Sequence, residues 1–217
     1  MPSRWSTNLI LSAAILCCGL PGLGHHAEAG EVLLLRHADK DRLRGDFNLS
    51  PRGFLRAIAL AQLIPACFGA PTTISTYNIN PFTGKNARSY QSAVPLAVTS
   101  GINIRIITTS PEHAFDFGKE LQQRIAATTG LHVIFWEHKR IPELARGLGW
   151  TSMPPIGDDD FDQLILLRYE GDSDQPSVQR FSQAEQFRKT CFTAAWQSSP
   201  FKLDLSPLLG SGSTTSE

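Results

Sequence analysis

The chain has 217 residues, with 20 basic and 20 acidic side chains and a formal net charge of zero at pH 7. This length and balance fit one soluble globular domain with a sizeable core. Without a basic excess, nucleic acid and acidic membrane surfaces are not expected partners.

The amino-terminal segment differs in character from the rest of the chain. Arg4 precedes a nearly continuous apolar run from Leu9 to Leu20, and Ala27-Glu28-Ala29 then offers the small-x-small pattern that a signal peptidase requires. The run is shorter than a transmembrane helix usually needs. We therefore expect residues 1–29 to be a cleaved signal peptide and the mature protein to be periplasmic or secreted, without stable membrane association. The alternative is an uncleaved segment that anchors the protein in a membrane.

Short apolar runs alternate with helical patterns along the rest of the chain. Strands are expected over 31–35, 72–77, 103–108, 131–136 and 161–169, and helices from Ser50 to Pro65, from Asn86 onward, over 117–128 and from Pro142 to Gly147. This alternation predicts an α/β fold with three layers, α/β/α, and a mostly parallel central sheet. The domain is expected to span 30–205, followed by a flexible tail over 206–217.

Cys67 and Cys191 are the two cysteines outside the amino-terminal segment. An exported protein meets an oxidising compartment, where such a pair can form a disulfide. Two separate buried thiols are the alternative, because a sequence does not give the distance between them.

Two apolar runs each lead to a histidine just past their carboxyl end, His37 after the first strand and His138 after the fourth. Ligands bind beyond the carboxyl ends of strands in an open parallel sheet, so we expect both imidazoles at one site. Arg36 precedes the first histidine, and Arg88 lies on the first turn of the helix that begins at Asn86. Two arginines and two neutral imidazoles indicate an anion site that contains a nucleophile.

These residues belong to a longer series of motifs. The series comprises Arg36-His37-Ala38 with Asp39-Lys40, Leu49-Ser50-Pro51-Arg52-Gly53 with Arg56-Ala57, Ala87-Arg88 with Gln91, and Trp136-Glu137-His138. In this order the motifs resemble the histidine phosphatase superfamily, also called phosphoglycerate mutase-like, over about residues 31 to 170. The compact length and the Arg-His-Ala-Asp-Lys form look more like its small exported hydrolases than its mutases.

The resemblance implies a phosphohydrolase that cleaves phosphomonoesters through a covalent phosphohistidine. His37 would be the nucleophile, Arg36 and Arg88 would clamp the phosphate, and His138 would donate to the transferring phosphoryl group. Physical chemistry agrees, because arginine donates two hydrogen bonds to a phosphate and its charge keeps a neighbouring histidine neutral.

We expect a small phosphorylated substrate and neither a cofactor nor a metal, since the two clamp arginines would repel a divalent cation. Arg52 and Arg56 are expected to form surface ion pairs instead. His132 lies inside a strand without a neighbouring arginine, so we expect it to be structural.

The leaving oxygen needs a proton, which the superfamily usually supplies from an acidic residue after the second arginine. In this chain that segment offers Glu112, which we expect to be the donor, with Asp116 as the alternative. Glu137 is a third candidate, but strand alternation would point it to the opposite side from His138.

Two other functions stay open at this point. One is a non-catalytic member of the same fold that binds a phosphorylated ligand without turnover. The other is a phosphohistidine-protein phosphatase, because a phosphoramidate leaving group needs less help from an acid, although export argues against it.

Overall fold

The computed structural model describes residues 30–41, 46–108, 113–125, 129–171, 173–201 and 203–209. Its strands are β1 (Gly30–Arg36), β2 (Pro71–Tyr77), β3 (Ile104–Ile107), β4 (Gly130–Trp136), β5 (Gln163–Tyr169) and β6 (Ser177–Ser182). Its helices are α1 (Pro51–Cys67), α2 (Ala87–Ser100), α3 (Ala114–Ile125), the 3-10 turn η2 (His138–Arg140), α4 (Ile141–Gly147), α5 (Gln183–Gln186), α6 (Thr190–Ser198) and α7 (Ser206–Leu209).

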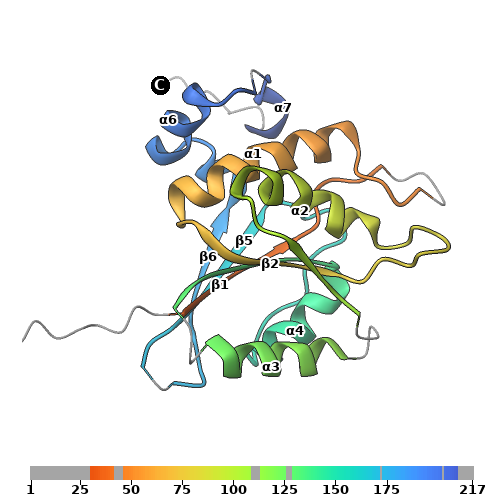
Figure 1. The fold of residues 1–217 in the computed structure, drawn as a ribbon, viewed down its shortest axis with the longest axis vertical. Helices are drawn as coiled ribbons and strands as arrows, with labels where there is room; N and C mark the ends of the chain where they lie inside the picture. The colour runs from red at the N-terminus through yellow and green to blue at the C-terminus, as the bar shows by residue number, and fades with distance from the viewer. Residues whose placement is uncertain are drawn as a thin grey trace, which may run out of the picture.

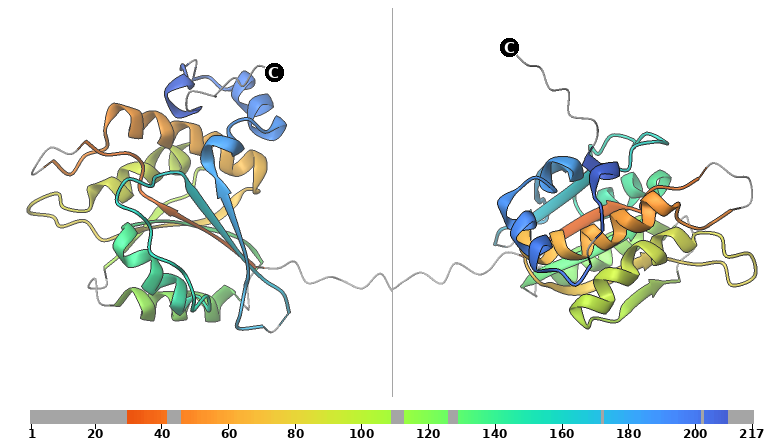
Figure 2. Two further views of the ribbon diagram at one scale, coloured as in Figure 1. Left: turned by 180° about the vertical axis from the view of Figure 1, so that it is seen from behind. Right: turned by 90° about the horizontal axis from the view of Figure 1, so that it is seen from above.

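The described strands form one sheet in the order β3-β2-β4-β1-β5-β6. The pairs from β3 to β1 are parallel, while β5 runs antiparallel to both β1 and β6. Helices α1 and α2 cover one face of the sheet, with α6 and α7 packed against α1 on that side, and α3 and α4 cover the other face (Figures 1 and 2). The predicted three-layer α/β/α fold with a mostly parallel sheet is confirmed.

Strand β1 forms the middle of the core because both of its faces are covered. Val32 and Leu34 pack in the cluster with α3 and α4, whereas Leu33 and Leu35 pack in the cluster with α1 and α2. All four side chains are at most 1% exposed. A strand buried on both faces has no polar positions to alternate with its apolar ones, which explains the continuous apolar run in the sequence.

Helix α1 begins where the sequence predicted and ends later. The Ser50 side chain accepts a hydrogen bond from the amide of Gly53 at 3.1 Å, and Pro51 takes the first helical position, where an amide hydrogen is not required. The predicted end at Pro65 is two residues early, because the last turn of the helix continues to Cys67. The amide of Phe68 closes this turn by donating to the carbonyl of Ile64 at 2.9 Å.

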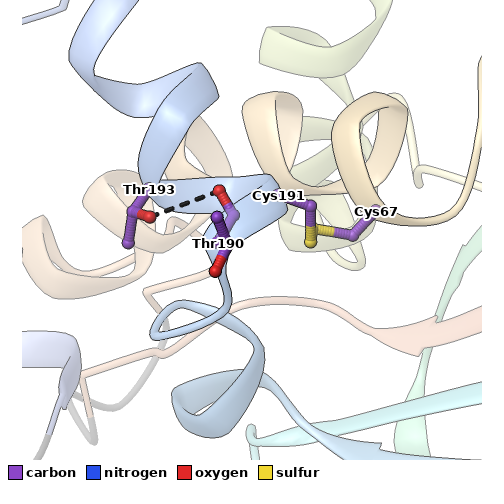
Figure 3. The surroundings of a disulfide bond; sticks show 4 residues. All are labelled: Cys67, Thr190, Cys191 and Thr193. Carbon is purple, nitrogen blue, oxygen red and sulfur yellow. Dashed lines mark hydrogen bonds between the residues drawn. A yellow bond between two sulfur atoms is a disulfide. The ribbon is translucent and has the colours of Figure 1, made fainter.

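The carboxyl-terminal helices are fastened to α1. A disulfide joins Cys67, at the end of α1, to Cys191 in the first turn of α6, with the two Cα atoms 5.4 Å apart (Figure 3). Residues 206–209, which fall in the predicted tail, form α7, and its Leu208 is 2% exposed. The predicted signal peptide over 1–29 lies outside the described residues. Within the described ranges, the helices are too short or too polar to cross a membrane.

Candidate active site

The ends of β1 and β4 bring the two predicted histidines to one place. The strands pair in parallel with Arg36 opposite Trp136, so the next residues leave the sheet at the same edge. The backbone amide of His37 extends this pairing by donating to the carbonyl of Trp136 at 3.1 Å. His37 and His138 line the same cavity, as the sequence predicted.

The cavity has a volume of about 610 Å³ and lies beyond the carboxyl edge of the parallel strands. Most of the described residues that line it are polar, and basic side chains predominate among them. It is lined by His37, Lys40, Phe47, Tyr77, Lys85, Asn86, Arg88, Ser89, Glu137, His138, Lys139 and Arg140.

His37 is held as a neutral imidazole with a defined tautomer. Its Nδ1 lies 2.8 Å from the carbonyl oxygen of Ala38, which can only accept, so Nδ1 carries the proton and Nε2 keeps its lone pair. Burial lowers the pKa of His37 to about 3, with further lowering by the charges of Arg36, Arg88 and Lys40. An uncharged ring with a free lone pair is what nucleophilic attack requires.

The start of α1 holds the loop that follows His37. The amide of Ser50 donates to the carbonyl of Asp39 at 3.0 Å, and a Cβ on Gly53 would lie only 2.1 Å from that carbonyl oxygen. Glycine is therefore required at this position of the Leu-Ser-x-x-Gly motif, because any side chain would push α1 off the loop.

The Asp39 carboxylate is anchored to α1 as well. Nε of Arg56 donates to Oδ2 of Asp39 at 2.5 Å, and the Arg56 side chain is 4% exposed. Arg52 also pairs with Asp39, at 3.3 Å, but its side chain is 52% exposed. The predicted surface pair is thus confirmed for Arg52 and wrong for Arg56, whose pair becomes buried because α1 packs against the active-site loop.

Arg88 reaches the cavity from the first turn of α2. Its Nε donates to the carbonyl of Asn48 at 2.8 Å, and its Nη2 donates to the carbonyl of Asp46. Burial lowers its pKa, while Asp46 acts in the opposite direction. Arg88 therefore lines the cavity, as predicted, and also fixes the loop over residues 46–48.

Two neighbours of Arg88 on α2 position the same loops. The Ser92 hydroxyl accepts a hydrogen bond from the amide of Ala38 at 2.9 Å, and Oε1 of Gln91 accepts from the amide of Leu49 at 2.9 Å. The bond to Leu49 explains why the motif has a glutamine three residues after the arginine. The part of Ser92 was not predicted, because a serine in a helix gives no signal for a contact with a distant loop.

Arg36 lies behind His37 and does not line the cavity. Its Nη1 donates to the carbonyls of Gly157 and Asp160 at 2.8 and 3.0 Å, and its Nη2 donates to the carbonyl of Asp158 at 2.8 Å. The guanidinium also stacks over the ring of Phe161, 4.0 Å from its centroid. Its buried Nε has no acceptor among the described residues.

His138 is 5% exposed and is flanked by two carboxylates. Its Nε2 lies 2.7 Å from Oδ1 of Asp158, and this hydrogen bond lowers the pKa of Asp158. Its Nδ1 lies 2.8 Å from Oε1 of Glu137, but the angle does not make a hydrogen bond. The contact with Asp158 was missed because a run of three aspartates indicates only a loop.

The three candidate proton donors have different outcomes. Glu112, the preferred one, lies outside the described residues, so its role stays a prediction. Asp116 is on the first turn of α3 and does not line the cavity. The prediction that Glu137 points away is wrong: β4 ends at Trp136, alternation ends with it, and Glu137 lines the cavity while its Oε2 accepts from the amide of Lys139 at 3.0 Å.

His132 lies away from the cavity, as expected of a structural residue. It is inside β4, and its Nδ1 is 2.8 Å from the hydroxyl of Thr73 on β2. Across the described ranges, no three His, Cys, Asp or Glu side chains are grouped so that they would hold a metal ion.

Comparisons with known proteins place this fold. No protein-family model matches the chain, and no curated protein matches it in sequence. Among solved structures, the protein histidine phosphatase SixA complexed with tungstate superposes with a TM-score of 0.50 at 11% identity, over 71% of this chain and 98% of SixA. A mycobacterial glucosyl-3-phosphoglycerate phosphatase gives 0.48 at 16% identity, over 71% of this chain and 98% of its own.

A phosphoglycerate mutase from Bacillus anthracis gives a TM-score of 0.47 at 11% identity, over 72% of this chain and 94% of its own. The likeness to SixA establishes the histidine phosphatase fold that the motifs predicted. Solved proteins with this fold include phosphatases.

Proposed function

We propose that the protein is a histidine phosphatase that hydrolyses phosphomonoesters through a phosphohistidine on His37. The observation that carries this proposal is the hydrogen bond from Nδ1 of His37 to the Ala38 carbonyl. It leaves Nε2 as the nucleophilic atom of a ring that burial keeps neutral, beside a basic cavity. A histidine with only a structural role would not need a free lone pair beside a cavity that is lined by cationic side chains.

The reaction proceeds in two displacements at phosphorus. Nε2 of His37 attacks the phosphoryl group, the N–P bond forms, and the P–O bond to the alcohol breaks while the leaving oxygen takes a proton from the general acid, for which Glu112 is the predicted residue. Water then gives a proton back to that carboxylate as it attacks the phosphohistidine, the N–P bond breaks, and inorganic phosphate leaves with His37 neutral again. Such transfers depend on positioning and on positive charge near the phosphoryl oxygens.

Arg88, His138 and Arg36 supply the charge and the donors in this scheme. Arg88 acts directly from the cavity wall. Arg36 contributes its charge from behind His37, and its Nε is the guanidinium nitrogen that the loop over 157–160 leaves without an acceptor. His138 donates to the phosphoryl group as it passes, which requires Nε2 to exchange its bond with Asp158 for one with the substrate.

A second candidate is phosphohistidine-protein phosphatase activity. Among the described residues that line the cavity, Glu137 is the one carboxylate, and it is already bound to the amide of Lys139. A phosphoramidate leaving group needs less protonation than an alkoxide, so this substrate would tolerate a site with a weak acid. Export of the protein, with 1–29 as the signal peptide, remains our expectation.

The test compares His37→Ala with His113→Ala, which changes an exposed histidine away from the cavity. We expect His37→Ala to abolish hydrolysis of 4-nitrophenyl phosphate and of sugar phosphates, and His113→Ala to retain it. Thermal unfolding should be similar for the two variants. Turnover at the wild-type rate in His37→Ala would refute the covalent mechanism. If the unmutated protein hydrolyses a phosphohistidine peptide but none of the phosphomonoesters, the second candidate is selected.

A further inference from the structure

Basic side chains from three different loops meet around the cavity. Lys40 comes from the loop after β1, Lys85 from the loop before α2, and Lys139 and Arg140 from η2 after β4. They join Arg88, so the described residues of the lining include five cationic side chains and one carboxylate, that of Glu137. Like charges brought together from separate loops repel one another, and a bound anion would relieve that repulsion.

The lysines in this group are not used to hold the protein together. In the described part of the chain, Lys40, Lys85 and Lys139 form no ion pair, whereas Arg140 pairs with Glu143 at 3.3 Å. Burial, together with the charges of Arg36 and Arg88, lowers the pKa of Lys40. The nearest described counter-charges, Glu137 and Asp158, already flank His138.

The cavity is also larger than the phosphoryl group that is to be transferred. Its 610 Å³ lies within the range of sites that hold whole drug-sized ligands. Such sites are usually lined mostly by apolar residues, whereas most of the described residues that line this one are polar or charged, with Phe47 and Tyr77 as the aromatic members. If Arg88 and His138 engage the transferred group, as in the proposed function, the lysines and Arg140 are left to face the rest of the substrate.

We propose that the cavity takes a small substrate with a second anionic group, a phosphate or a carboxylate, in addition to the phosphate that is cleaved. Lys85, Lys139 and Arg140 bind this second group. The inference rests on the proposed phosphatase function for which end of the substrate reacts. It predicts that bisphosphates are preferred over monophosphates of the same alcohol, and that this preference weakens as salt screens the charges.

The first test compares fructose 1,6-bisphosphate with fructose 6-phosphate in the full chain. We expect kcat/KM to be about tenfold or more higher for the bisphosphate, since two charge-assisted contacts are worth at least that factor. The double variant Lys85→Gln/Lys139→Gln should reduce this ratio by about tenfold. Lys119→Gln, which changes an exposed lysine on α3 away from the cavity, should leave the ratio as it is.

The second test measures binding without turnover, so that the subsite and the phosphatase function can fail separately. Calorimetry on His37→Ala should give a Kd about tenfold or more lower for fructose 1,6-bisphosphate than for fructose 6-phosphate, and Lys85→Gln/Lys139→Gln in the same background should remove the difference. Equal affinity for the two sugars, or an equal loss in Lys119→Gln, would overturn the second anionic subsite. Absence of any turnover together with the expected binding difference would overturn only the phosphatase function.

Discussion

The two helix layers that cover the sheet contribute differently to the protein. Helices α1 and α2 hold the loops of the cavity, through Ser50 and Arg56 to Asp39 and through Ser92 to Ala38. Helices α3 and α4 pack closely on each other, and α4 reaches the cavity lining where its Glu143 pairs with Arg140 at 3.3 Å. The loop that carries the nucleophile is therefore held by α1 and α2, and we expect the α3 and α4 layer to contribute mainly to stability.

Glycines show how close α3 and α4 approach. A Cβ on Gly118 would lie 2.4 Å from the carbonyl oxygen of Leu144, and one on Gly147 would lie 2.1 Å from that of Phe115. Substitutions in this layer should therefore change the free energy of unfolding and leave kinetics alone. Substitutions in the α1 and α2 layer should change both.

The largest effect is expected for Arg56→Ala. It leaves the Asp39 carboxylate buried without its main partner, which costs about 3–5 kcal/mol for a buried pair. It should also lower kcat, because Asp39 lies in the loop that holds the His37 ring. Urea unfolding and steady-state kinetics provide the two measurements.

Arg52→Ala is the matched control, since Arg52 pairs with the same carboxylate from an exposed position. Its loss should cost at most about 1 kcal/mol. Equal destabilisation by the two variants would show that burial does not distinguish these pairs, and the proposed anchoring of the loop by α1 would be wrong.

Arg88→Ala should come next. We expect kcat/KM to fall by about 3 kcal/mol in transition-state stabilisation, which is the usual cost of removing a charged donor to a transferring group. Arg105→Ala, on the exposed side of β3, should change kcat/KM little. Similar losses in both variants would mean that Arg88 is not part of the clamp.

The proton donor should have a smaller effect that depends on the substrate. If Glu112 protonates the leaving oxygen, Glu112→Gln should slow sugar phosphates by roughly a hundredfold and 4-nitrophenyl phosphate far less, since nitrophenolate leaves without a proton. Glu137→Gln and Asp116→Asn give the same comparison for the other two carboxylates. Equal slowing of both substrate types by a variant excludes that residue as the acid.

Gly147→Ala should have the smallest effect on kinetics and act on stability alone. The added methyl group would meet the backbone of α3, which yields less easily than a side chain, so it should cost about 3 kcal/mol or more of unfolding free energy, with kcat/KM unchanged. Gln123→Ala, on the exposed side of α3, should stay within about 0.5 kcal/mol of wild type. A fall in kcat/KM for Gly147→Ala would show that the layer of α3 and α4 also positions the site.

The sequence predicted the parts of the fold that have one strong local cause. The run before His37 is apolar because β1 is covered on both faces, and Ser50-Pro51 marks a helix start through capping alone. The strand β6 was missed because it is an edge strand whose exposed positions are polar. Helices α6 and α7 were missed because their burial depends on α1 and on the disulfide. Contacts of these kinds leave no periodic pattern in the sequence of the two helices.

The same division applies to the site. His37, His138 and Arg88 were found because each lies at the end of an element that the pattern defines. Asp158, Ser92 and the burial of Arg56 were not found, because each depends on a contact between segments far apart in the chain. Glu137 was misplaced because the expected alternation assumed that β4 continues past Trp136.

Trapping of the phosphoenzyme tests the central claim most directly. Wild-type protein, mixed with a substrate labelled in its phosphoryl group and quenched in alkali, should carry the label on Nε2 of His37. The label should disappear after an acid quench, because a phosphoramidate is stable in alkali and is hydrolysed in acid. The label should be absent from His37→Ala and present in His113→Ala. An acid-stable label, or a label on any residue other than His37, would contradict the mechanism.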